Sequence, residues 1–169
     1  ILLDGLRANS VMISECNEPL PIINLKTTNK LNCWAYNFVY AVMLFKSYVK
    51  LFIKFFFKSK GCKIVIVGFP FMYDAILAYL LCVLMGKKLF VDFFVSLYET
   101  NVVDRKQYSL MSMRAKKLFL IDYLTAHLAD KLIVDTLAHK DYFKNLFRLK
   151  DDKFMLARVG AYDRFVKPA

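Results

Sequence analysis

The chain has 169 residues, of which 58% are hydrophobic, enough for the core of one domain. Lysine and arginine outnumber aspartate and glutamate by 25 to 14, and the net charge of +11 predicts an anionic partner. Lipid headgroups, phosphorylated substrates and nucleic acid all fit this charge, but the 16 phenylalanines and 10 tyrosines favour a membrane surface, and charge is the only argument for nucleic acid. We therefore expect no nucleic-acid partner.

Cysteine and histidine usage argues against disulfides and metal. Cys16, Cys33, Cys62 and Cys82 form no CxxC pair and lie in apolar runs, so free thiols in a reducing compartment are expected. The two histidines have no His or Cys at ligand spacing, so no metal site is expected. No signal peptide is visible, and the longest uncharged runs, 13 and 12 residues, are shorter than the ~20 needed to span a bilayer. The expected location is cytoplasmic, peripheral at the inner membrane surface.

Apolar periodicity predicts an alternation of helices and strands. In chain order these are a helix at 1–9, a strand at 11–16, a loop at 17–32, a helix at 34–58, a strand at 63–69, a helix at 71–85 ended by Gly86, a strand at 88–94, a helix at 111–129, a strand at 131–136, a helix at 137–147 and a strand at 153–159. Such alternation is typical of α/β proteins with a parallel sheet and right-handed crossovers. We therefore predict a Rossmann-like sheet with helices on both faces.

The helix predicted at 34–58 combines lysines and aromatic residues. Lys46, Lys50, Lys54 and Lys58 recur at every fourth residue and so lie on one stripe. The remaining surface holds several phenylalanines, a composition typical of helices that lie in a membrane interface. The stripe is interpreted either as a membrane-binding surface or as an ordinary solvated helix face.

Candidate site residues follow the predicted strands, because ligands of open α/β sheets bind beyond the carboxyl ends of the strands. No GxGxxG or GxxxxGK[ST] motif occurs, so dinucleotide and P-loop chemistry is not expected. The segment 92–105 is the most polar of these strand ends, and Asp92, beside two phenylalanines, requires a partner. The candidates for the cleft lining are Gly68, Phe69, Asp92, Ser96, Tyr98, Glu99, Arg105, Asp135, Thr136 and His139.

Three of these motifs also have purely structural interpretations. Gly68 and Phe69 belong to a turn that takes the chain out of its strand. Asp135 and Thr136 form a good N-cap for the helix at 137–147, since their side-chain oxygens can accept from free amides. His139, one turn into that helix, is either a general base or an exposed surface residue.

The order of these motifs resembles the amino-terminal domain of family 4 GT-B glycosyltransferases. The matching pieces are LLDGLRAN before a strand, IVIVGFP with an Asp just beyond it, the strand GKKLFVD followed by FVSLYET and DR, and LADKLIVDT before AH. The final RVGAYDRFVKP at 158–168 is similar to the family's segment where the first domain leads into the second. The resemblance covers nearly the whole chain.

The resemblance implies the acceptor-side domain of a sugar transferase. It places the acceptor-side domain at 1–158 and the start of an interdomain linker at 159–169, with a donor-binding domain in cis or trans. That absent domain would hold a nucleotide sugar, and no cofactor is expected in this chain. The acceptor would be a glycan or a lipid-linked molecule. Asp92 or Glu99 would take the proton of the acceptor hydroxyl, and the family implies retention of configuration.

The chain also departs from the family pattern. The family opens with a central strand and a Gly-rich loop, which are missing before residue 1, and Arg158 and Tyr162 differ within the linker segment. We therefore expect a fragment or one half of a split enzyme, inactive alone. The alternative function is a non-catalytic basic domain that binds a membrane or a partner chain carrying the donor domain.

Overall fold

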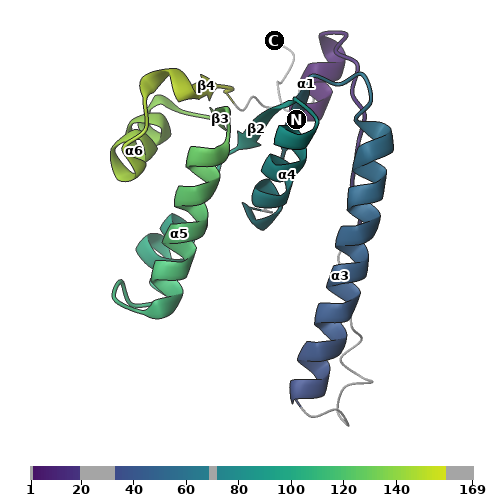
Figure 1. Cartoon of the computed structure of the whole chain (residues 1–169). Coiled ribbons are helices and arrows are strands. Elements are labelled where there is room, and N and C mark those ends of the chain that lie inside the picture. Colours follow the sequence, from purple (N-terminus) through teal and green to yellow (C-terminus); the bar gives the residue numbers. More distant parts are fainter. Residues whose placement is uncertain (1, 20–32, 69–71, 159–169) are drawn as a thin grey trace, which may run out of the picture. The chain divides into compact units, whose positions relative to one another are not determined.

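The computed structural model describes residues 2–19, 33–68 and 72–158. The chain divides into two compact units, Leu2–Cys62 and a second unit that runs from Lys63 (Figure 1). The range 1–158 was predicted as one domain, and the boundary between the two units falls within it, between Cys62 and Lys63. The predicted linker at 159–169 and the greater part of the predicted loop at 17–32 lie outside the described residues.

The first unit contains α1 (Leu2–Ala8) and α3 (Cys33–Lys58), and both helices were predicted from the sequence. Residues 11–16 do not form the predicted strand. Met12, for example, is 95% exposed, although its apolar side chain fits the alternating pattern. A strand needs a neighbour for its backbone donors and acceptors, and no described strand pairs with this segment.

The segment after α1 is held against α3 by the predicted lysine stripe. Lys54 and Lys50 form ion pairs with Glu18, and Lys58 Nζ donates to the carbonyl oxygen of Glu15 at 2.8 Å. Arg7 of α1 also pairs with Glu15. Three of the four stripe lysines therefore have partners within their own unit.

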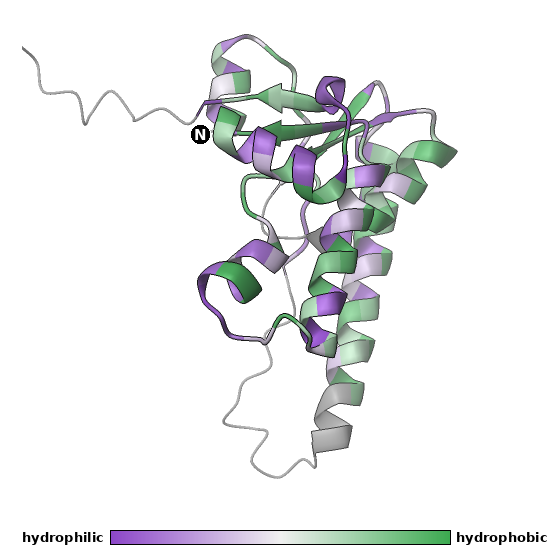
Figure 2. Ribbon diagram, turned by 90° about the vertical axis from the view of Figure 1, so that its left-hand side faces the viewer, coloured by the Kyte–Doolittle hydropathy of each residue, from purple (hydrophilic) through white to green (hydrophobic). Residues whose placement is uncertain are grey.

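The second unit is built on a four-stranded, fully parallel sheet. Its strands are β1 (Ile64–Val67), β2 (Lys88–Asp92), β3 (Lys131–Val134) and β4 (Phe154–Leu156), in the spatial order β1-β2-β3-β4. The arrows that can be seen in Figure 2 are mostly green, because these strands are largely apolar. The register places the ends of the strands side by side, with Val67 opposite Val91 and Asp92 opposite Ile133. All carboxyl ends therefore lie along one edge, as the sequence predicts for an α/β sheet.

Three helices connect these strands: α4 (Met72–Leu84), α5 (Met113–Leu128) and α6 (Leu137–Phe147). Consecutive strands are neighbours, so right-handed crossovers place all three helices on one face of the sheet. The contacts agree, since α5 packs on α4 and ring contacts join Phe119 and Tyr123 of α5 to Phe147 of α6. The sequence predicts helices on both faces of the sheet, but these three crossovers place helices on one face only.

The helix ends follow the local sequence. Gly86, at a φ of 63°, ends α4 in the left-handed region that glycine adopts without strain, as predicted. Ser112 caps α5 by accepting from the amide of Ala115 at 3.1 Å. Cys16, Cys62 and Cys82 form no disulfide among the described residues, and Cys33 has no described side chain.

Candidate active site

Four predicted site residues gather at the carboxyl edge of β2 and β3. Asp92 is the last residue of β2, and Asp135 directly follows β3. Glu99 begins η1 (Glu99–Asp104), a π-helical turn in the β2–α5 connection, and His139 lies in the first turn of α6. Asp92 interacts electrostatically with Asp135, and Glu99 with His139. We name Asp92, Glu99, Asp135 and His139 the carboxylate–histidine cluster.

The centre of the cluster is a hydrogen bond between Asp135 and His139. The carboxylate Oδ1 and the ring Nδ1 are 2.7 Å apart, and the imidazole is about one third exposed. Burial raises the pKa of Asp135, but the hydrogen bond from His139 and the nearby backbone amides outweigh it and hold the pKa below its usual range. Asp135 is therefore an ionised acceptor that orients the imidazole with Nδ1 toward it, leaving Nε2 on the other side of the ring.

The two remaining acids have more basic carboxylates than free Asp and Glu. Burial raises the pKa of Asp92, an amide hydrogen bond from Phe94 opposes the rise, and the charge of Asp135 adds to it. Burial also raises the pKa of Glu99, where His139 lowers it and Asp104 raises it. Carboxylates of this kind accept hydrogen bonds from ligand hydroxyl groups.

Ser96 and Tyr98, both predicted to line the cleft, are placed differently. Ser96 is fully buried, and its Oγ donates to Asp122 Oδ2 at 2.6 Å and accepts from the amide of Glu99 at 2.9 Å. The ring of Tyr98 is half-buried against Phe119, with centroids 5.3 Å apart. Ser96 thus holds the loop that carries Glu99 in place, and its hydroxyl is not open to a ligand.

Asp122 of α5 is the residue that sequence analysis missed. It is fully buried, and its Oδ2 also accepts from the amide of Tyr98 at 2.8 Å. Burial raises the pKa of Asp122 to about 6, against the lowering effect of Ser96 and the amides of Tyr98 and Leu97. A single acid within the apolar run FLIDYL was the available signal, but the strand-end rule does not search helices.

The other candidates are not members of the cluster. Thr136 is the N-cap of α6 and accepts from the amide of His139 at 3.1 Å, so the structural interpretation of this residue is confirmed. Arg105 is exposed at the end of η1, and Gly68 follows β1. Phe69 lies outside the described residues. Tyr142, which sequence analysis did not select, has a pKa raised by burial and by the charge of Glu99.

The cap makes a testable contribution to the position of His139. We expect Thr136→Ala to lower the free energy of unfolding by about 1 kcal/mol, because the His139 amide loses its acceptor. Thr136→Ser keeps the hydroxyl and should retain most of that stability. Chemical unfolding of the two variants beside the unsubstituted chain measures this, and equal loss in both would contradict a role through the hydroxyl.

The cluster is not a metal centre: within residues 2–19, 33–68 and 72–158, no group of three or more His, Cys, Asp or Glu could hold a metal ion. No protein-family model matches the chain, and neither a similar curated protein nor a similar solved structure was found.

Proposed function

We propose that this chain is the acceptor-binding part of a glycosyltransferase. The parallel α/β sheet with a polar cluster at its carboxyl edge is compatible with the sequence resemblance to GT-B enzymes. The observation that carries the proposal is the Asp135–His139 pair beside the half-buried carboxylates of Asp92 and Glu99. Carboxylates and an oriented imidazole are groups that bind and activate sugar hydroxyls.

In this proposal His139, rather than Asp92 or Glu99, receives the proton. Nε2 accepts the proton of the acceptor hydroxyl as its oxygen bonds to the anomeric carbon from the face that the nucleotide phosphate leaves, and the bond from that carbon to the phosphate breaks, so the configuration is retained. Asp135 stabilises the imidazolium that forms, because its carboxylate already accepts from Nδ1. Asp92 and Glu99 accept hydrogen bonds from neighbouring hydroxyls. The nucleotide sugar is bound by a second domain, in cis or in trans.

The test is transfer of a labelled sugar by the chain together with a donor-binding domain encoded in the same frame or by an adjacent gene. We expect His139→Ala to lower kcat by about 10²- to 10⁴-fold, the usual contribution of a general base. Asp135→Asn keeps the size of the side chain but not its charge, and it should lower kcat less while leaving KM nearly unchanged.

Arg148→Gln is the matched control, because Arg148 is exposed at the end of α6, away from the cluster. If His139→Ala kept full activity and Asp92→Asn or Glu99→Gln lost it, a carboxylate and not His139 would be the group that accepts the proton. Failure of the assembled protein to transfer sugar from any common nucleotide donor would reject the proposed function. Binding of methyl glycosides without turnover would favour a non-catalytic domain.

A further inference from the structure

The connection into α5 carries an unusual run of positive charge. Residues 105–120 contain five cations and no Asp or Glu: Arg105, Lys106, Arg114, Lys116 and Lys117. All five side chains are exposed. Among the described residues none of the five has an ion-pair partner, whereas Lys50 and Lys54 of α3 are paired with Glu18. This run is separate from the lysine stripe of α3 that was predicted from the sequence.

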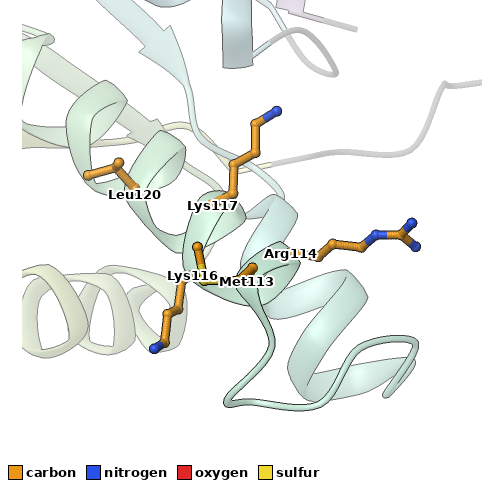
Figure 3. Close-up of a pocket in the computed structure, with 5 residues that line it drawn as sticks. All are labelled: Met113, Arg114, Lys116, Lys117 and Leu120. Atoms are coloured by element: carbon orange, nitrogen blue, oxygen red, sulfur yellow. The ribbon is translucent and has the colours of Figure 1, made fainter.

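The same segment exposes large aliphatic side chains. Leu110 is 63% exposed, Met111 and Met113 are each 79% exposed, and Leu120 is 54% exposed. Met113 and Leu120 also line an open pocket of about 470 Å³ on α5, together with Arg114, Lys116 and Lys117 (Figure 3). Contiguous exposed apolar residues rimmed by charge mark an interaction surface. We name the exposed side chains of 105–120 the basic-apolar patch.

The directions of the cations indicate the kind of ligand. In Figure 3, Arg114, Lys116 and Lys117 extend from the helix in three different directions and do not converge on one point. A free phosphate or phosphorylated metabolite is bound by donors that converge on it, whereas diverging cations match an extended negative surface. The exposed residues between them are aliphatic, and the ring of Tyr108 is covered by Arg114 at 5.5 Å, so no stacking platform for bases is offered.

We infer that the basic-apolar patch docks on an anionic lipid surface, with Leu110, Met111 and Met113 inserted among the headgroups. Exposed apolar side chains beside lysines and arginines are the composition of interfacial membrane-binding segments, and both kinds of contact add to the affinity. None of the described helices is long and apolar enough to cross a bilayer. The docking would be peripheral and would rely on this patch, not on the lysine stripe of α3.

The patch is joined to the loop that carries Glu99 through α5. Phe119 touches Tyr98, and Asp122 accepts from Ser96 and Tyr98. Met113 precedes Asp122 by nine residues on the same helix, a distance of roughly 14 Å at 1.5 Å per residue. Docking would therefore hold the carboxylate–histidine cluster near the lipid headgroups. The inference itself stands on the charge and exposure of the patch and does not depend on the proposed transfer reaction.

Vesicle sedimentation of the full 169-residue chain tests the inference. We expect binding to vesicles of phosphatidylcholine and phosphatidylglycerol that weakens with salt, and little binding to phosphatidylcholine alone. Lys106→Gln/Lys116→Gln/Lys117→Gln should lower the partition coefficient by about 100-fold, since each cation near an anionic surface contributes roughly fivefold. Leu110→Ser/Met111→Ser/Met113→Ser should also weaken binding and leave a residual, fully salt-sensitive component.

The matched control is Lys46→Gln/Lys50→Gln/Lys54→Gln, which removes the same charge from α3 and should change binding less than threefold. Thermal unfolding of each variant checks that the fold is kept. The inference is overturned if the α3 variant, and not the patch variants, loses binding. It is also overturned if soluble glycerol phosphate displaces the vesicles, if an RNA oligomer binds more tightly than the vesicles through the same lysines, or if the serine variant binds like the unsubstituted chain.

Discussion

Replacing Asp122 with alanine should destabilise the second unit by about 3 kcal/mol. The loss follows from two donors, the buried hydroxyl of Ser96 and the partly buried amide of Tyr98, which would be left without their acceptor. Because the same contacts position the loop that carries Glu99, the variant should also lose activity. Urea unfolding measures the stability. Hydrogen exchange should show faster exchange at the Tyr98 and Glu99 amides than at the amides of β3.

The pH dependence of stability distinguishes the charge of Asp122 from its hydrogen bonds. Its ordinary pKa is 3.8 and its folded pKa is about 6, so between these values the folded chain retains a proton that the unfolded chain releases. The contribution of Asp122 to the free energy of unfolding is therefore highest below pH 3.8, and it falls by about 3 kcal/mol as the pH rises through 6.

Asp122→Asn is the matched variant for this dependence. The amide oxygen can still accept from Ser96 and Tyr98, but the side chain does not titrate. The difference in unfolding free energy between the variant and the unsubstituted chain should change between pH 4 and pH 7, in favour of Asn at the higher pH. A difference that is constant across this range would show that Asp122 does not bind a proton as inferred.

Replacing Phe93 with alanine should cost about 3–5 kcal/mol, the range for removing a large aromatic side chain from a core. Phe93 follows β2 and is fully buried, with its ring edge-on to Phe143 at 4.9 Å and to Phe147 at 6.0 Å. It therefore joins the end of the central strand to α6, the helix that carries His139. Thermal or urea unfolding measures the loss.

The neighbouring residue is the control for this substitution. Phe94 is 37% exposed, so Phe94→Ala should cost well under half as much as Phe93→Ala. Equal effects at the two positions would contradict the core that the structure describes. A retained fold with reduced activity in Phe93→Leu would show that packing under α6 also positions His139.

The elements of the second unit could be predicted because their signals are local. A β-branched run such as that of β1, the glycine that ends α4 and the Thr136 cap each depend on a few adjacent residues. The strand-end rule selected Asp92, Glu99, Asp135 and His139, because the carboxyl ends of parallel strands meet at one edge. Residues 11–16 failed as a strand prediction because alternation shows which side chains could be buried, not whether a partner strand exists.

The sequence by itself determined the α/β class, the parallel sheet and the positions of most helices, since periodicity and capping act within one element. Only the tertiary structure decided that three stripe lysines bind the 15–18 segment, that Ser96 turns inward to Asp122 and that Asp135 holds His139. Each is a contact of a side chain with a group that lies three or more residues away in the sequence. They depend on how the chain packs, because a side chain's hydrogen-bond partner is set by distance in space and not by position in the sequence.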